Sequence, residues 1–203
     1  MQTPRRKGLA VADRDSHLRL WLTVGLGFAV DLAAKYLGWA LLGGPLETGG
    51  REIAVVPGWL RLVASYNPGI VFGFNVSESL GLGPVAGQGL TVLLTLATSA
   101  LILYVFATSL PGQRWLHLWC GLILAGAFGN LYDRIVFGRV RDLIQITAHA
   151  TVGGVPLQWP YIFNLADVYL VIGVFAVAAT YLLGHRPDSA DREGRGPRKD
   201  AHV

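Results

Sequence analysis

Four acidic residues of this sequence lie within or beside long apolar stretches, where a carboxylate is costly unless it is paired or used. They are Asp31, Asp133, Asp142 and Asp167, and the other acids fall in polar tails or in a turn-rich segment. Two carboxyl groups at close range cannot both ionise easily. One can then hold a proton and act as an acid while the other activates water, so the sequence offers general acid–base chemistry.

Asp142 and Asp167 are the best candidates for such a pair. Asp142 lies in VRDLIQI, an apolar segment typical of a strand or an interfacial stretch. Arg141 could pair with it, although neighbours in an extended chain point to opposite sides. Asp167 lies near the start of the apolar stretch FNLADVYLVIG, and Asn164 three residues earlier resembles the first member of a capping box. Helix capping alone would therefore also account for Asp167.

Asp31 and Lys35 lie one helical turn apart in FAVDLAAKYLGW. An acid and a base at this i, i+4 spacing form the least costly pair in an apolar helix, so we expect a structural ion pair. A proton relay is the alternative, but no further acids within the apolar stretches support it. Asn130, Asp133 and Arg134 fall near the end of another apolar stretch, where a capped and charge-paired helix end would explain them.

The composition places these residues in a membrane protein. Hydrophobic residues make up 52% of the 203 residues and charged residues only 15%, and the mean hydropathy is +0.45. This excludes an ordinary soluble domain and a disordered chain, since both carry more charge. Four apolar stretches come near the roughly 20 residues that cross a bilayer as a helix. They are Leu18 to Leu42, Gln88 to Leu110, Trp115 to Leu131 and Ile162 to Leu183.

The positive charges indicate how these spans are oriented. Eleven of the 17 Lys and Arg lie before or at the start of the first span, in the turn at Arg114 or after the fourth span. Such charges stay on the cytoplasmic side, so both termini are expected in the cytoplasm. The basic residues form no stripe that would indicate nucleic-acid binding. The single cysteine, Cys120, excludes a disulfide framework within the chain and a cysteine-based zinc cluster.

We therefore predict an all-α membrane protein with four transmembrane helices and a small outer-face β-sheet. The sheet is expected in the first outer loop, where β-branched and aromatic residues are interrupted by turns at Pro57-Gly58 and Asn67-Pro68-Gly69. The predicted parts are a cytoplasmic N-terminal tail (1–17), a membrane domain (18–184) with outer loops at 43–87 and 132–161, and a disordered cytoplasmic C-terminal tail (185–203).

In this topology Asp142 and Asp167 both lie on the outer side, since the third span runs outward and the fourth runs inward. They can approach each other near the membrane surface, in the arrangement of an aspartic protease. Other chemistry is poorly supplied, because the histidines are scattered and neither a zinc-protease helix motif nor a Gly-x-Ser-x-Gly elbow is present. No metal or other cofactor is expected.

The ordered motifs resemble those of the lipoprotein signal peptidases, or type II signal peptidases, of bacteria. The matching segments are FAVDLAAKYLGW, NPGIVFG, GNLYDRIVFGRVRD and FNLAD, in this order along the four spans. The resemblance implies that Asp142 and Asp167 are the catalytic aspartates and that Asp31 and Lys35 form a structural or supporting pair. It further implies substrate-binding or supporting roles for Asn67, Gly69, Asn130, Asp133, Arg134 and Asn164.

The resemblance also implies an activity and a location. Such an enzyme is an aspartic endopeptidase of the bacterial cytoplasmic (inner) membrane, with its active site at the outer face. It removes signal peptides from prolipoproteins by cleaving before the diacylglyceryl-modified cysteine. Its partners would be these prolipoproteins and membrane lipid, and we expect a monomer.

Two other functions stay open, and three residues depart from the family pattern, Pro68, Arg141 and Val168. The chain could be a non-catalytic family member that binds lipidated peptides, or a small proton-coupled transporter, which the uncharged second span disfavours. Arg141 stands where the family usually has an apolar residue. A cation beside Asp142 is expected to lower the pKa of that carboxyl.

Overall fold

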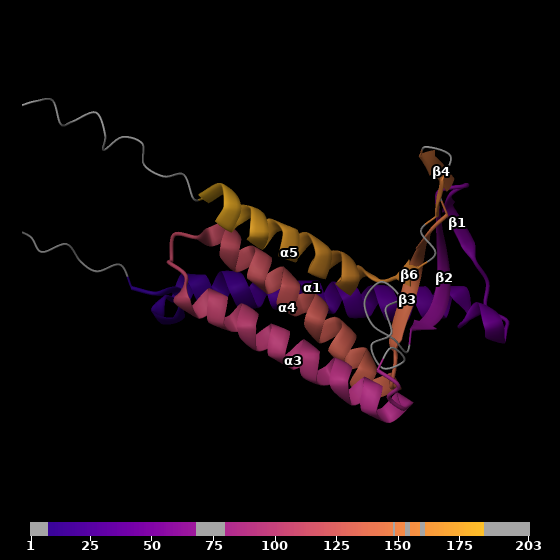
Figure 1. Ribbon diagram of the computed structural model, residues 1–203, viewed down its shortest axis with the longest axis horizontal. Coiled ribbons are helices and arrows are strands. Elements are labelled where there is room, and N and C mark those ends of the chain that lie inside the picture. Colours follow the sequence, from indigo (N-terminus) through magenta and orange to yellow (C-terminus); the bar gives the residue numbers. More distant parts are fainter. Residues whose placement is uncertain (1–7, 68–79, 148, 153–154, 159–160, 185–203) are drawn as a thin grey trace, which may run out of the picture.

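The computed structural model describes residues 8–67, 80–147, 149–152, 155–158 and 161–184. Within these ranges, four long helices lie side by side and the strands gather at one end of the bundle (Figure 1). The first helix begins and the last helix ends at the opposite end of the bundle. Gly69 and the predicted tail 185–203 lie outside the described residues.

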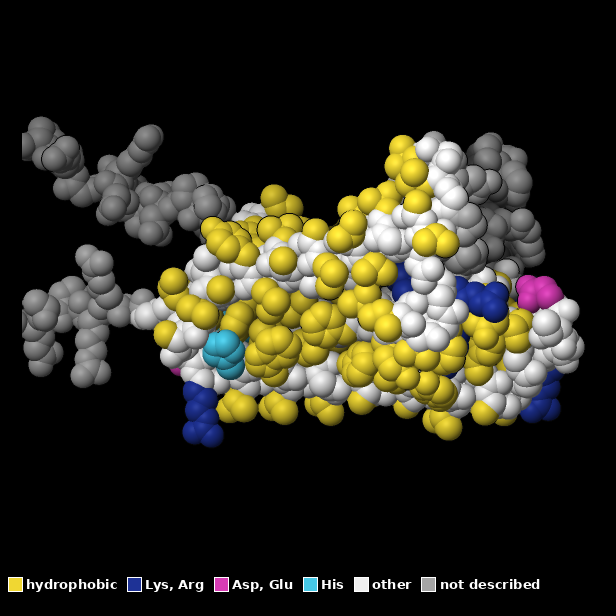
Figure 2. Space-filling model, turned by 90° about the horizontal axis from the view of Figure 1, so that it is seen from below, with side chains coloured by type: hydrophobic (Ala, Val, Ile, Leu, Met, Phe, Trp, Pro, Cys, Tyr) yellow, Lys and Arg dark blue, Asp and Glu magenta, His cyan; other side chains and the backbone are white. Residues whose placement is uncertain are grey.

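Each of these four helices is long and apolar enough to cross a membrane. Hydrophobic side chains cover the bundle along its length, and the charged side chains on this face lie toward its two ends (Figure 2). The chain is therefore a multi-pass membrane protein, as predicted. The helices are α1 (Arg14–Leu42), α3 (Pro84–Thr108), α4 (Arg114–Phe137) and α5 (Leu165–Gly184), with the short 3-10 helices η1 (Ala10–Ala12) and η2 (Leu46–Thr48).

α1 begins four residues before the predicted start of the first span. The side chain of Asp13 accepts a hydrogen bond from the backbone N of Ser16 over 2.8 Å, which is the arrangement of a helix N-cap. The helix therefore starts at Arg14 rather than at Leu18.

α4 continues beyond the predicted end of the third span, from Leu131 to Phe137. It ends at Gly138, which has φ = 73°, a left-handed conformation that favours glycine. The N–H of Gly138 donates to the carbonyl of Arg134 over 3.0 Å. The extra turns place Asp133 within the helix, and the glycine turns the chain back toward α1 as a strand.

α4 is the central helix of the bundle and packs against α1, α3 and α5. Glycines on it allow close approach of the neighbouring helices. A Cβ added at Gly121 would lie 2.8 Å from the Cβ of Thr23 on α1, and one added at Gly126 would lie 3.0 Å from the Cγ of Leu170 on α5. Most of the polar groups on this helix are consequently buried between helices.

The main sheet has the strand order β1-β2-β3-β6, and its neighbouring strands are antiparallel. Asn67 pairs with Val140 and Ser65 pairs with Asp142, so the first loop and the second loop meet in this sheet. The strands predicted in the first loop are confirmed, and the strand predicted around Asp142 joins them. The strands are β1 (Ile53–Val56), β2 (Leu60–Asn67), β3 (Val140–Ile146) and β6 (Ile162–Phe163), with a separate hairpin of β4 (His149–Val152) and β5 (Val155–Gln158).

Candidate active site

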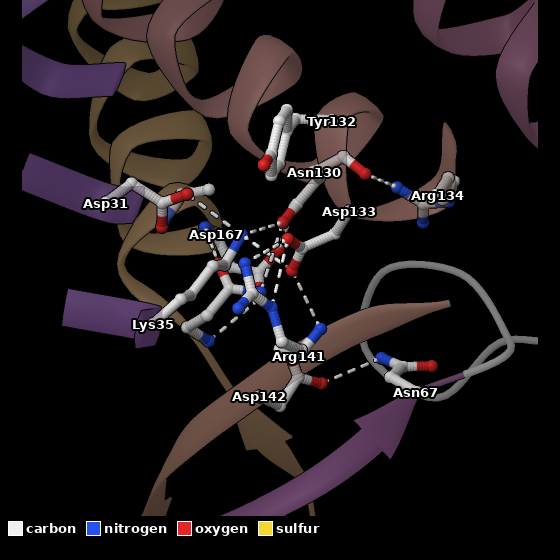
Figure 3. A network of polar contacts seen from close by, with 12 residues as sticks. Asp31, Lys35, Asn67, Asn130, Tyr132, Asp133, Arg134, Arg141, Asp142 and Asp167 are labelled. Atoms are coloured by element: carbon white, nitrogen blue, oxygen red, sulfur yellow. Dashed lines mark hydrogen bonds and ion pairs between the residues drawn. The ribbon is translucent and has the colours of Figure 1, made fainter. Parts of the chain in front are cut away.

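Asp142 on β3 and Asp167 on α5, which we call the dyad, meet where the sheet joins the helices (Figure 3). Asn164 links them. Its Nδ2 donates to Oδ1 of Asp142 over 2.7 Å, and its backbone N donates to Oδ2 of Asp167 over 3.0 Å. Its Oδ1 accepts from the backbone N of Asp167 over 3.1 Å, so the predicted capping box is present. The box also explains why α5 begins at Leu165 and not at the predicted Ile162.

Asn130 on α4 holds Asp167 from the other side. Its Nδ2 donates to Oδ1 of Asp167 over 2.8 Å. Its Oδ1 accepts from Nζ of Lys35 and from Nδ2 of Asn164, each over 3.1 Å. Because an ammonium group can only donate, Lys35 fixes which end of the amide faces it. The NH₂ end of Asn130 therefore faces the carboxyl group of Asp167.

Asp142 is almost fully buried, with 1% of its surface exposed. Both of its oxygens accept hydrogen bonds, Oδ1 from Asn164 and Oδ2 from Nδ2 of Asn67 over 3.0 Å. Burial, and after it the negative charge of Asp167, raise the pKa of Asp142 from an ordinary 3.8 to about 7, although the two amide donors oppose the shift. This carboxyl group can therefore hold or release a proton near neutral pH.

Arg134 lies on the last turns of α4, and its side chain is mostly buried. Its Nη1 donates to the backbone O of Asn130 over 3.2 Å, and its guanidinium attracts the carboxylates of Asp167 and Asp142. Its own carbonyl accepts from Nε2 of Gln88 over 3.0 Å, which joins the start of α3 to the end of α4. Arg134 thus supplies a positive charge beside the dyad from a fixed position.

Asp31 and Lys35 form the predicted ion pair, with Nζ of Lys35 2.9 Å from Oδ2 of Asp31. Lys35 also lies 3.3 Å from Oδ2 of Asp133. Oδ1 of Asp31 accepts from the backbone N of Ala166 over 2.9 Å, so α1 also holds the first turn of α5. All three ionic side chains are buried between helices.

Arg141 does not pair with Asp142. Its Nη2 lies 2.8 Å from Oδ1 of Asp133, and its backbone N donates to Oδ2 of Asp133 over 2.9 Å. The guanidinium carbon lies 4.2 Å from the ring centres of both Tyr36 and Phe137. Burial is the main reason that the pKa of Asp142 is raised overall. Arg141 and Asp142 are consecutive in a strand, so their side chains lie on opposite faces.

A cavity of about 390 Å³ lies beside the dyad, where residues of α3, α4 and α5 converge. Asp167 lines it directly, and Asn67 lines it while donating to Asp142. The cavity is therefore polar where it meets the dyad and apolar where it extends among the helices. The other lining residues include Asn130, Arg134, Thr91, Thr95, Thr98, Ala127, Leu170, Val171, Val174 and Phe175.

Gln88 and the threonines of α3 lie at the site but were not among the residues predicted for it. Thr91, Thr95 and Thr98 recur at helical spacing on a stretch without charge, and this pattern could have marked the face of α3 toward the cavity. Gln88 offered no such signal, because a single glutamine near a helix start is common. Among the described residues, no group of three or more His, Cys, Asp or Glu side chains is arranged to hold a metal ion.

Fold and site together define a multi-pass membrane protein with two linked carboxyl groups at one end of its helices. Residues 23–183 match the family described as signal peptidase (SPase) II, and the chain belongs to this family. The lipoprotein signal peptidase of Desulfitobacterium hafniense is 31% identical over 170 residues, which are 83% of this chain and 96% of that protein. That of Chlorobaculum tepidum is 37% identical over 131 residues, which are 63% of this chain and 74% of that protein. The family resemblance of the sequence motifs is thereby confirmed.

Two solved structures of bacterial membrane enzymes share the fold. One has a TM-score of 0.58 at 22% identity and covers 94% of this chain and 97% of its own. The other has a TM-score of 0.59 at 22% identity and covers 87% of this chain and 96% of its own. At this identity the likeness concerns the fold alone.

Proposed function

We propose that this protein is an aspartic endopeptidase that removes signal peptides from prolipoproteins. The observation that carries the proposal is the link between Asp142 and Asp167 through Asn164, in a chain that belongs to the signal peptidase II family. A buried carboxyl group with a pKa of about 7 and a second, partly buried carboxyl group that lines the cavity supply both an acid and a base near neutral pH.

In the proposed reaction, one carboxyl group of the dyad is protonated and the other is ionised. The ionised group takes a proton from a water molecule, whose oxygen attacks the scissile carbonyl carbon. The protonated group gives its proton to the carbonyl oxygen. When the tetrahedral intermediate collapses, one of its hydroxyl groups returns a proton to the dyad, the C–N bond breaks and the leaving amine takes up a proton from the dyad. The dyad ends the reaction with one proton, as it began. The enzyme is inactive when both carboxyl groups are ionised, because no proton is then available for the carbonyl oxygen.

The three asparagines are proposed to orient the dyad. Asn164 and Asn130 each turn an NH₂ group toward a carboxyl group, and their amide oxygens are occupied by donors. Asn67 both lines the cavity and donates to Asp142, so a peptide bond that enters from the cavity would meet the dyad at this side chain. Such fixed positioning is a large part of the rate that an enzyme gains.

The cavity supports a substrate that is largely apolar. It is lined by aliphatic and aromatic side chains of α5, such as Leu170, Val174 and Phe175, and has its polar groups at the dyad end. We propose that a signal peptide and the acyl chains of a diacylglyceryl-modified cysteine use this apolar surface and the lipid beside it. The cut then falls before the modified cysteine.

The proposed orientation puts both termini in the cytoplasm and the dyad at the outer face. At the sheet end, Arg134 and Arg141 are buried within the protein, which leaves Arg51, Arg61 and Arg139 as the basic residues of that end that reach its surface. Most Lys and Arg of the chain belong to the other end. This distribution supports the assignment by the positive-inside rule. Cysteine labelling of the N-terminal tail in intact cells and in inverted vesicles tests it.

The test of the enzymatic proposal uses the purified full-length protein and a synthetic diacylglyceryl-modified lipopeptide. Asp142→Asn and Asp167→Asn, made separately, should each reduce turnover by a factor of at least about 10³. Asp15→Asn changes an exposed acid at the far end of α1 and should retain turnover. Mass spectrometry of the products locates the cut. Retained turnover in either dyad variant contradicts the mechanism, and binding without cleavage by the wild-type protein would make it a lipopeptide-binding family member.

A further inference from the structure

We propose that Arg141 is a positioning residue for Asp142. With Asp133 it fixes strand β3 against the end of α4, and its positive charge balances the buried carboxylates behind the dyad. This inference rests on the proposed function, because it concerns how one member of the dyad is held and how readily it ionises.

Three hydrogen bonds join Asp133 on α4 to Arg141 on β3. Both oxygens of Asp133 are used by Arg141: Oδ2 accepts from its backbone N over 2.9 Å, and Oδ1 accepts from Nη2 over 2.8 Å and from Nε over 3.2 Å. Asp133 has no exposed surface, and Arg141 is 3% exposed. A buried ion pair is favourable only when its geometry is good and its remaining polar groups are satisfied, and this pair meets that condition.

The guanidinium of Arg141 packs on two aromatic rings. Its carbon lies over the ring of Tyr36 on α1 and over the ring of Phe137 on α4, at 4.2 Å from each ring centre. Cation–π contacts of this kind strengthen when the cation is desolvated. Arg141 is thus fixed to two helices, and the next residue in the strand, Asp142, is directed to the opposite face, where Asn164 and Asn67 meet it.

The buried charges behind the dyad cancel one another. Asp31, Lys35, Asp133 and Arg141 form a buried chain in which acids and bases alternate, at 2.9, 3.3 and 2.8 Å. This chain is neutral as a whole. Without Arg141 it would carry one negative charge, and that charge would oppose the ionisation of a nearby carboxyl group.

The described groups that act on Asp142 come from each element packed around it. Asp167 on α5 raises its pKa, Lys35 on α1 lowers it, and Arg134 on α4 attracts its carboxylate. Asn67 on β2 and Asn164 before α5 donate to its oxygens. Since these groups are left intact by a change at Arg141, the effect of that change on the protonation of Asp142 can be measured separately.

The experiment compares two single variants and their double variant in the lipopeptide cleavage assay. At an effective dielectric constant of about 20, a unit charge about 10 Å away shifts a pKa by about one unit. Arg141→Met leaves the buried chain of charged residues with a net negative charge, so the pH midpoint at which activity is lost should rise by about this amount. Asp133→Asn leaves the same buried residues with a net positive charge, so this midpoint should fall by about as much. The double variant is neutral again and should return it close to the wild-type position.

A purely structural role predicts a different result. Loosening of β3 would reduce kcat in both single variants but would not move the pH profile in opposite directions. Equal shifts in the same direction, or no shift in either, would overturn the proposal. Arg139→Met is the matched control, because Arg139 is exposed, stacks on Tyr66 at 3.7 Å and takes no part in the buried chain. It should leave the profile unchanged.

Arg141→Lys provides a second route should the other variants not accumulate. It keeps the positive charge and loses the planar fork that reaches Asp133. The pH profile should stay at the wild-type position while kcat falls several-fold, and an unchanged kcat would contradict a positioning role. If Asp142→Asn and Asp167→Asn abolish turnover but Arg141 variants change neither kcat nor the pH profile, this inference fails while the proposed function stands.

Discussion

Asn164 and Asp142 are joined by a hydrogen bond of 2.7 Å between Nδ2 and Oδ1. The same asparagine caps α5 by exchanging hydrogen bonds with Asp167. One residue therefore starts a membrane-spanning helix and ties together the two carboxyl groups. The cap and the link to Asp142 use different atoms of Asn164, so substitutions can separate its effect on stability from its proposed effect on catalysis.

Asn164→Ser keeps the cap and removes the link to Asp142. A serine Oγ can accept from the backbone N of Asp167, but it is too short to donate to Asp142 at the same time. We expect kcat to fall about 100-fold because the dyad is no longer positioned, with little loss of thermal stability. Asn164→Ala should lose kcat to the same extent and about 1 kcal/mol of stability as well, since the cap is lost. Full kcat in the serine variant would contradict the positioning role.

The activity should fall as the pH rises through about 7. The pKa of Asp142 is raised to about 7, so this carboxyl group keeps its proton below that pH and loses it above. Above it both members of the dyad are ionised, and no proton is available for the scissile carbonyl. Measurement of kcat from about pH 3 to about pH 9 gives the midpoint. A midpoint near the ordinary carboxyl value of 3.8 would refute this explanation.

Asn67→Ala should move that midpoint to higher pH. The hydrogen bond from Asn67 favours the ionised form of Asp142 and lowers its pKa, so its removal makes the proton harder to lose. The same pH series measures the shift. A midpoint that moves to lower pH would show that Asn67 acts on Asp142 in another way.

The sequence predicts the contacts that depend on helical spacing. Asp31 and Lys35 are four residues apart, and Asn164 and Asp167 are three apart, so each pair meets within one element whatever surrounds it. Four apolar stretches likewise define four helices, because length and hydrophobicity suffice for that prediction.

The contacts that cross between elements could not be predicted in this way. Lys35 reaches Asn130 across 95 positions of the sequence, which requires the packing of α1 on α4. Arg141 meets Asp133 because α4 runs on to Gly138 and the chain then turns back, whereas the predicted span ended too early for this. The alternation of side chains along a strand already argued against a direct pair of Arg141 with Asp142. That Asp133 is the partner of Arg141 instead could not be predicted.

Asp142→Asn should remove part of the pH dependence of stability. Because the pKa of Asp142 is raised in the folded protein, the folded state keeps a proton between about pH 3.8 and about pH 7 that the unfolded chain releases. The wild-type free energy of unfolding therefore falls as the pH rises through this window. Asp142→Asn has no carboxyl group to titrate at this position and lacks this pH dependence. Its free energy of unfolding minus that of the wild type should therefore increase from about pH 4 to about pH 8, by on the order of a few kcal/mol. Thermal unfolding in detergent measures the difference, and parallel curves would contradict the burial of an ionising group at this position.

Gly129→Ala tests the packing that holds Asp31 in place. A Cβ at Gly129 would overlap Oδ2 of Asp31 and lie 3.0 Å from its Cγ, so the carboxylate would have to move. Asp31 holds the backbone N of Ala166 over 2.9 Å and the ammonium of Lys35 over 2.9 Å, and both contacts would be strained. We expect a loss of about 1–3 kcal/mol of stability and a reduced kcat.

Gly25→Ala is the matched control for this substitution. Gly25 lies on the same helix as Asp31, and a Cβ added there meets no atom within 4 Å. The methyl group would extend from the exposed side of α1, and alanine is the better helix former by about 1 kcal/mol in water. Stability should therefore be unchanged or slightly higher, with full kcat. If both glycine variants lose stability equally, the effect comes from the loss of glycine in a membrane helix rather than from displacement of Asp31.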